Sequence, residues 1–206
     1  MTSPRLTPAA ERIVQLALQH FANRGYDAAS LNDIAVSAGI RKASLYAHFT
    51  GKDELYCAVL DLALKSEQDY VDGQFSAATR DRVPGERYVN HLQRRFGDSS
   101  ALRFLLRAAF YPPAPIEQKV KAAFEHYLAG IAERFQAALK RACPDLGLQQ
   151  SNVLAEAYLA LIDSLHVELI YGNAPAYARR LNALRQLINL IDVAALAGIA
   201  PSEQAR

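Results

Sequence analysis

Apolar residues recur at the spacing of an α-helix along almost the whole chain, and this periodicity constrains the fold more than any other feature. Residues three or four positions apart share one face of a helix, so a stripe at that spacing predicts an amphipathic helix. The alternation typical of a strand is almost absent. The clearest stripe, between residues 115 and 143, consists of Ile116, Val120, Phe124, Tyr127, Leu128, Ile131, Phe135 and Leu139.

Residues typical of helix ends divide the N-terminal part into short helices. Thr7 is expected to cap a first helix that begins at the following proline and ends at Gly25. Ser30 is expected to cap a short helix that Gly39 ends. A second short helix is expected over about residues 42–48, and a long helix begins at Lys52.

Longer helices are expected in the rest of the chain, over about residues 84–96, 101–111, 115–143, 149–171 and 175–197. The fold class predicted is all-α, with an N-terminal three-helix domain that contains a helix-turn-helix, over residues 1–52. A helical bundle over residues 53–206 follows it.

Composition narrows the class of protein. Apolar residues make up 51% of the 206 residues and charged residues 21%, which allows a substantial buried core. No apolar stretch approaches the roughly 18 residues of a membrane span, and the N-terminus lacks the pattern of a signal peptide. Cys57 and Cys143 fit no metal or redox spacing and are interpreted as reduced thiols. A cytoplasmic location is therefore expected.

Charge is distributed unevenly. The net charge is +2, but residues 1–52 hold six Lys/Arg against three Asp/Glu, whereas the remainder is slightly acidic. This mild asymmetry permits an anionic partner at the N-terminal end without proving one.

Two short helices joined by a glycine turn, after a longer supporting helix, are typical of a helix-turn-helix. Its expected apolar anchors are Leu31, Ile34, Ala35, Ile40, Leu45 and Phe49, which would pack against Phe21. The opposite face of the second helix carries Lys42, Ala43, Tyr46 and Ala47. Donors suited to phosphate oxygens lie near the helix ends, at Ser30, Ser44, Tyr46, His48 and Lys52.

The segment SLNDIAVSAGIRKASLYAHFTGKDELYCAVL resembles the DNA-binding segment of TetR-type repressors, above all in IA..AG, LY.HF and K.EL. The resemblance covers about residues 13–59. It implies that Tyr46 and His48 contact the DNA backbone, and that Lys52 and Ser30 each bind a phosphate. It further implies that Lys42, Ala43 and Ala47 face base edges, with Asn32 a possible extra reader.

Two positions depart from the family pattern. Arg41 stands where a serine or threonine commonly caps the recognition helix, and Ala43 replaces a frequent glycine or proline. A missing cap costs about 1 kcal/mol of helix stability, so this helix is expected to be less stable before DNA binds. Alternatively, Arg41 adds a contact to a DNA phosphate. Lys42 is the only long polar side chain on the outward face, which predicts sparse base reading, supplemented by thymine methyl contacts from Ala43 or Ala47.

The last two helices have leucine-rich stripes that suggest a dimer interface, formed when two such hairpins make a four-helix bundle. The alternative is an internal core. The predicted interface residues are Leu154, Leu161, Leu165, Leu169, Leu181, Leu184, Ile188 and Ile191.

An effector pocket is expected among the helices of residues 84–170, because apolar and aromatic side chains with a few polar groups suit a small ligand. For each residue a plain core role is the alternative. Asp163 and His166 lie one helical turn apart, where they pair with each other or form a bond across the dimer, contact an effector, or hold a metal. The candidates are Tyr88, His91, Phe104, Arg107, Phe110, Tyr111, Phe124, Tyr127, Tyr158, Asp163 and His166.

No nucleophile elbow, phosphate loop or metal-ligand spacing is present in the sequence, so neither catalysis nor a cofactor or metal is predicted. The function predicted is that of a homodimeric repressor that binds double-stranded operator DNA and is released by a small, apolar effector. The alternative is a DNA-binding activator, or a regulator without an effector.

Overall fold

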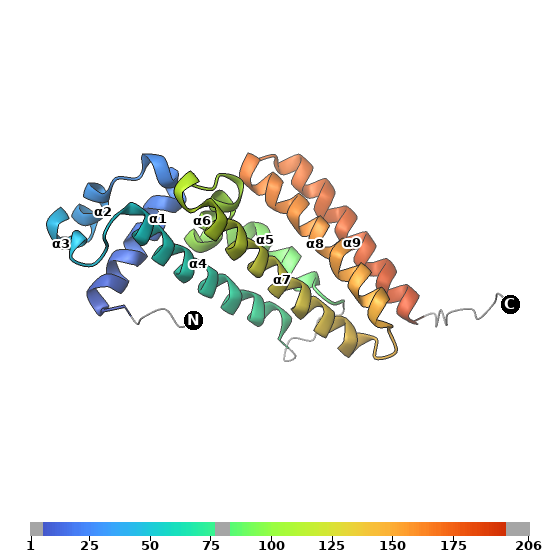
Figure 1. Cartoon of the computed structure of the whole chain (residues 1–206). Helices are drawn as coiled ribbons and strands as arrows, with labels where there is room; N and C mark the ends of the chain where they lie inside the picture. Colours follow the sequence, from blue (N-terminus) through green and yellow to red (C-terminus); the bar gives the residue numbers. More distant parts are fainter. Residues whose placement is uncertain (1–5, 77–82, 197–206) are drawn as a thin grey trace. The chain divides into compact units, whose positions relative to one another are not determined.

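A computed structural model describes residues 6–76 and 83–196. Over these residues the chain is helical, as Figure 1 shows, and none of the described helices is long and apolar enough to cross a membrane. The helices are α1 (Pro8–Ala28), α2 (Leu31–Ser37), α3 (Lys42–Tyr46), α4 (Lys52–Phe75), α5 (Glu86–Asp98), α6 (Ser100–Phe110), the 3₁₀ turn η1 (Ala114–Ile116), α7 (Glu117–Ala142), α8 (Leu148–Tyr171) and α9 (Ala174–Leu196). The all-α prediction is confirmed.

Packing divides the chain into two compact units. Unit 1 comprises Met1–Asp69 and Arg95–Tyr127, and unit 2 comprises Tyr70–Arg94 and Leu128–Arg206. The helices α4, α5 and α7 each contribute residues to both units.

Local signals set most of the helix ends. The hydroxyls of Thr7, Ser30 and Ser99 accept bonds from backbone amides in the first turns of α1, α2 and α6, as expected for N-caps. The first helix differs from the prediction. At Gly25 the backbone turns to φ +76°, and one further turn of helix follows, so that α1 extends to Ala28 with a kink rather than ending at Gly25. The recognition helix ends at Tyr46, two residues earlier than predicted.

Unit 1 is built around an aromatic centre. The ring of Phe21 in α1 lies edge-on to Tyr56 in α4 at 4.9 Å between centroids, and Phe104 in α6 lies 4.8 Å from Tyr56. All three side chains are buried, and α1 packs extensively on α6. The supporting helix α1 is therefore held by α6 and by Tyr56 of α4, and it also packs on α2, which in turn packs on α3.

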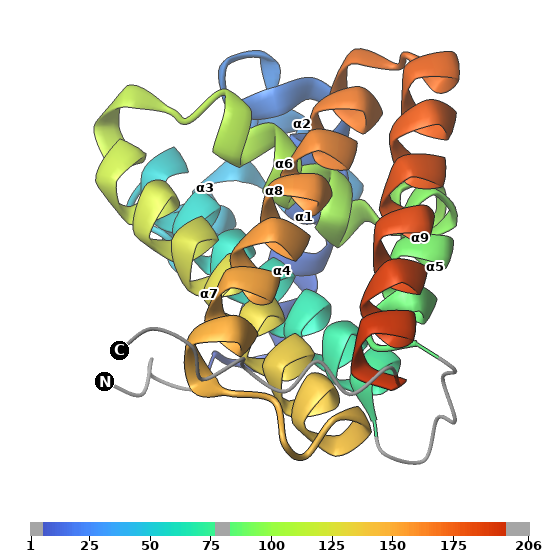
Figure 2. The ribbon, with the colours of Figure 1, turned by 90° about the vertical axis from the view of Figure 1, so that its right-hand side faces the viewer.

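Unit 2 is held by a second aromatic group and by the hairpin of α8 and α9, which run side by side (Figure 2). Phe135 in α7 stacks on Tyr158 in α8 with ring centroids 4.1 Å apart and planes 3° from parallel. The Tyr158 hydroxyl donates to the backbone carbonyl of Gly85 at 3.0 Å. Gly172, at φ +70°, ends α8 in the left-handed conformation that favours glycine.

Candidate nucleic-acid interface

The turn between α2 and α3 is fixed by its own backbone. Gly39 lies at φ +68°, and its amide donates to the carbonyl of Val36 at 3.0 Å. The amide of Ile40 donates to the carbonyl of Ala35 at 3.0 Å. These bonds end α2 and redirect the chain within four residues, which is the geometry of a helix-turn-helix.

Apolar side chains anchor α3, which is too short to be stable alone. Leu45 is fully buried, and Phe49, just after the helix, is 2% exposed. Both belong to one core cluster with Ile34 and Ala35 of α2 and Phe21 of α1. The predicted anchoring of the short helix by its neighbours is therefore confirmed.

The other face of α3 is open to solvent. Lys42, Ala43, Tyr46 and Ala47 are all exposed. The Lys42 ammonium lies 5.9 Å from the centroid of the Tyr46 ring, so the only long cation on this face is drawn towards the aromatic ring one turn away.

The N-terminus of α3 has no side-chain cap. Arg41 occupies the cap position in an extended conformation and makes no capping hydrogen bond. Its side chain is exposed. The loss of the usual serine or threonine cap is thus real in the structure, while a phosphate contact from Arg41 stays a prediction.

The remaining predicted donors surround this face. Ser30 caps α2 through bonds from the amides of Asn32 at 3.2 Å and Asp33 at 3.4 Å. Asn32, Ser44 and His48 are exposed. Asn32 lies in the first turn of α2, Ser44 in the middle of α3 and His48 just after α3, so these three polar side chains are open to a phosphate oxygen.

Lys52, at the start of α4, is already held by the end of α1. Its ammonium donates to the backbone carbonyl of Asp27 at 3.2 Å and lies 4.6 Å from the centroid of the Tyr26 ring. Tyr26 was not among the residues that the sequence singles out. The sequence shows only an aromatic residue just after Gly25, which does not indicate a partner 26 residues away.

The predicted effector residues do not gather in one unit. Unit 1 holds Phe104, Arg107, Phe110, Tyr111, Phe124 and Tyr127, and unit 2 holds Tyr88, His91, Tyr158, Asp163 and His166. Five of the eleven are at most 2% exposed, and these are Tyr88, Phe104, Tyr127, Tyr158 and His166. Tyr111 is well exposed instead, so the set mixes core, intermediate and surface positions.

Several polar members of this set have partners within their own unit. The Arg107 guanidinium donates from Nε to the carbonyl of Ala22 at 3.2 Å, just before the kink in α1. A ring nitrogen of His91 lies 3.2 Å from the side-chain oxygen of Gln74. His166 Nδ1 lies 3.6 Å from an oxygen of Asp163, and His166 is buried while Asp163 is half-exposed. Pairing between these last two residues agrees with this distance.

The predicted dimer residues also differ in exposure. Leu165 and Leu184 are buried within the single chain, where they pack in unit 2. Leu154, Leu161, Leu169 and Leu181 are half-buried, and the side chains of Ile188 and Ile191 lie outside the described residues. The interface predicted from the sequence did not include a second face of α8. This face consists of Val153, Ala157, Ala160, Ser164, Val167 and Tyr171.

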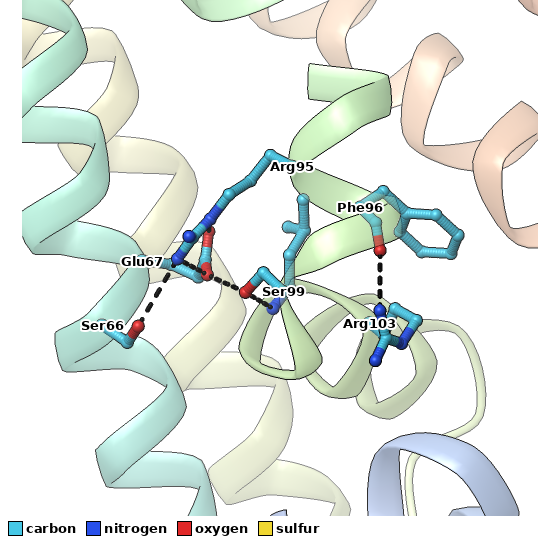
Figure 3. A network of polar contacts seen from close by, with 7 residues as sticks. Ser66, Glu67, Arg95, Phe96, Ser99 and Arg103 are labelled. Carbon is cyan, nitrogen blue, oxygen red and sulfur yellow. Dashed lines mark hydrogen bonds and ion pairs between the residues drawn. The ribbon is translucent and has the colours of Figure 1, made fainter. Parts of the chain in front are cut away.

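A buried polar network in unit 1 joins three helices (Figure 3). Glu67 of α4 is fully buried and accepts bonds from the guanidinium of Arg95 at 2.6 and 3.3 Å. The same carboxylate accepts a bond from the hydroxyl of Ser99, which caps α6, at 2.8 Å. The network therefore fixes the end of α5 and the start of α6 on α4.

An exposed short helix that is anchored by its own core, with hydroxyl, amide and ammonium donors at its rim, defines a DNA-binding protein of the helix-turn-helix class. Residues 13–59 match the family model described as "Bacterial regulatory proteins, tetR family". This range contains the whole of α2, the turn, α3 and the start of α4.

Two curated relatives are regulators by name. The chain is 27% identical over 165 residues to the HTH-type transcriptional regulator BetI of Rhizobium meliloti (strain 1021), which covers 79% of this chain and 78% of that protein. It is 44% identical over 46 residues to the biofilm operon icaADBC HTH-type negative transcriptional regulator IcaR of Staphylococcus epidermidis, a match that spans 22% of this chain and 25% of IcaR.

Solved structures share the fold over most of the chain. A tetR-family transcriptional regulator from Streptomyces coelicolor covers 94% of this chain and 90% of its own, with a TM-score of 0.68 and 19% identity. A TetR transcriptional regulator from Chloroflexus aurantiacus gives 0.67 over 88% and 94%, with 18% identity. Residues 13–59 are therefore similar to the DNA-binding segment of the tetR family, and most of the chain has the fold of the solved TetR regulators.

Proposed function

We propose that the chain is a homodimeric repressor that binds a pseudo-palindromic operator and leaves it when a small, apolar molecule binds. Residues 1–52 would form the DNA-binding domain, and residues 53–206 would bind the effector and the second subunit. The observation that carries the proposal is the anchored helix α3 with its exposed face of Lys42, Ala43, Tyr46 and Ala47. This action would take place in the cytoplasm, where operator DNA lies.

On DNA, α3 would enter the major groove. Lys42, Ala43 and Ala47 would face base edges, with the alanines against thymine methyl groups, and Asn32 would add a contact from α2. The flanking donors would bind the backbone and set the register of the protein on the duplex. These donors are Ser30, Arg41, Ser44, Tyr46, His48 and Lys52.

A dimer would bring two recognition helices to half-sites about 34 Å apart, one helical turn of DNA. The feature that supports it is the uncharged outer face of α8. Val153 is 63% exposed and Tyr171 67% exposed, and Ala160 between them is exposed as well. Exposed apolar side chains that share one face of a helix are typical of an interface. The half-buried Leu154, Leu161, Leu169 and Leu181 would border it.

Release would follow from a difference in affinity. In one conformation of the dimer the two α3 helices match successive major grooves, and in another they do not. An effector that binds the second conformation more tightly would lower operator affinity. The size of this effect is set by the ratio of the effector's affinities for the two conformations. The helix α4 is suited to this role because it begins at Lys52 on the DNA side and contributes residues to both units. The repressor role is supported by the name of IcaR as a negative regulator.

A regulator without an effector is the second candidate. It is favoured by the burial of Tyr88 and Tyr158, since the Tyr158 ring is stacked on Phe135 and its hydroxyl is bonded to Gly85. These aromatic side chains are already covered within the chain and need no ligand.

A single titration separates the two candidates. A duplex selected by the protein from a randomised library is labelled, and its anisotropy is followed while a panel of small apolar and aromatic compounds is added. The repressor proposal expects at least one compound that stabilises the protein against heat and also lowers operator affinity. A compound that binds and stabilises but leaves operator affinity unchanged would contradict release by an effector.

A further inference from the structure

The Lys52 ammonium lies between the Tyr26 ring and the Asp27 carbonyl, two groups that we call the Lys52 cage. The expected DNA contact of Lys52 does not explain why these groups surround it. Its ammonium lies 4.6 Å from the centroid of the Tyr26 ring and donates to the Asp27 carbonyl at 3.2 Å. Both partners follow the kink at Gly25, in the last turn of α1. The cage therefore joins the end of the supporting helix to the first residue of α4.

The Tyr26 ring is itself fixed on two sides. It lies edge-on to the ring of Tyr56 with centroids 5.4 Å apart, and its hydroxyl donates to a carboxylate oxygen of Asp53. Burial and the Asp53 carboxylate raise the pKa of Tyr26 to about 12, so the hydroxyl remains a donor at neutral pH. The ring thus has little freedom to move away from Lys52.

Lys52 needs such support because of its position. A cation in the first turn of a helix faces the positive end of the helix dipole, which disfavours it there. The negative face of an aromatic ring and a carbonyl oxygen both offset this effect. An unrestrained lysine also loses rotamer freedom when it binds a phosphate, whereas one already held loses less. The ammonium has three donors, and the Asp27 carbonyl uses one of them.

We propose that Tyr26 is a positioning residue for DNA binding, whose ring holds the Lys52 ammonium in the place where it binds a backbone phosphate. The inference rests on the proposed phosphate contact of Lys52. Tyr26 touches no DNA itself, and acts through Lys52 alone. If Tyr26 only filled the core, its substitution would weaken DNA binding equally with and without Lys52.

A double-mutant cycle tests this. Affinity for the selected duplex is measured by anisotropy over a range of salt for the wild type, Tyr26→Leu, Lys52→Ala and the double variant. Tyr26→Leu removes the ring face and is expected to weaken binding about two- to fivefold, the range of an exposed cation–π contact. In the Lys52→Ala background the same change is expected to have no further effect.

The conservative variant Tyr26→Phe keeps the ring and removes only the hydroxyl bond to Asp53. It is expected to restore the affinity and the salt dependence lost in Tyr26→Leu, while its melting temperature falls below that of the wild type. If the role of Tyr26 were purely structural, DNA affinity would fall together with the melting temperature. A Tyr26→Phe variant with a lower melting temperature but wild-type affinity therefore identifies a positioning role.

The double-mutant cycle distinguishes a wrong role for Tyr26 from a wrong role for Lys52. If Tyr26→Leu weakens binding equally with and without Lys52, Tyr26 acts on the fold and the inference is overturned, although the phosphate contact stands. If Lys52→Ala itself leaves affinity and salt dependence unchanged, the proposed phosphate contact is wrong, and the inference falls with it.

A measurement on the free wild-type protein covers the case in which Tyr26→Leu does not fold. Lysine amines carrying ¹³C-methyl groups are observed by NMR, and the Lys52 signal is identified by its loss in Lys52→Arg. A signal shifted upfield by the Tyr26 ring, relative to the other lysines, is expected. A Lys52 signal at the position of a free lysine would overturn the inference.

Discussion

Gly85 allows a close contact between its backbone and the side chain of Tyr158 in unit 2. Its φ of +78° lies in the left-handed region, and a Cβ atom there would lie 2.8 Å from ring atoms of Tyr158. The same close approach lets the Tyr158 hydroxyl reach the Gly85 carbonyl. Both the backbone conformation and the space are therefore reserved for glycine.

Gly85→Ala is accordingly expected to lower the free energy of unfolding by about 1–3 kcal/mol. Gly73→Ala is the matched control, because Gly73 lies inside α4 with open space around its Cα, and there alanine is expected to add about 0.5–1 kcal/mol. Chemical denaturation measures both. Equal effects of the two substitutions would contradict the close packing of Tyr158 on Gly85.

Glu67 offers a second test at the scale of one side chain. Glu67→Gln removes the buried charge that neutralises Arg95, whose side chain is only 23% exposed, and breaking a buried ion pair costs about 3 kcal/mol. The control is Glu117→Gln, which removes a pair with Lys121 in which both side chains are about half exposed, and is expected to cost less than about 1 kcal/mol. A Glu67→Gln variant as stable as the control would show that the network contributes little.

At the scale of elements, local chemistry in the sequence was enough to predict most helix starts. The predicted caps Thr7 and Ser30 hold helix starts because their hydroxyls accept bonds from amides two or three residues away, an interaction that needs no distant partner. The helix end predicted at Gly25 was wrong, because a glycine in the sequence marks the break but does not show that the helix resumes for another turn.

The absent cap of α3 gives a prediction for that element. Arg41→Ser supplies a hydroxyl at the cap position and is expected to stabilise unit 1 by about 0.5–1 kcal/mol. Thermal unfolding checks this, with Arg41→Ala as the control that removes the arginine without adding a cap.

The same pair of variants decides the role of Arg41 on DNA. If the guanidinium binds a phosphate, both variants reduce the slope of log affinity against log salt by about 1. If only the cap matters, Arg41→Ser binds at least as well as the wild type, and Arg41→Ala, which like the wild type has no cap, leaves affinity and salt slope unchanged. Any result in which Arg41→Ser neither stabilises the protein nor alters binding would contradict both explanations.

At the scale of the whole molecule, sequence periodicity shows which face of a helix is apolar but not which neighbour covers it. Leu165 and Leu184 were predicted at a dimer interface, yet both are buried within one chain. The eleven effector candidates are likewise divided between two units. The cage around Lys52 depends on residues about 25 positions apart, a relation that no local pattern encodes.

The proposed dimer is tested on the outer face of α8. Ala160→Arg places a charge in the middle of that face and is expected to convert a dimer into a monomer, because a buried unpaired charge is costly. Ala122→Arg, at an exposed position of α7, makes the same change elsewhere. Sedimentation velocity gives the mass. A dimer unchanged by Ala160→Arg would exclude this face.

The most direct test of the central claim is the affinity of the full chain for its selected duplex, measured by anisotropy at several salt concentrations. The comparison is between the wild type and the double variant Tyr46→Ala/Lys52→Ala, which removes two proposed backbone contacts of the interface. We expect a marked loss of affinity on every duplex, with the salt slope reduced by about 1 for the lost lysine–phosphate contact. Wild-type affinity and an unchanged slope in the double variant would contradict it.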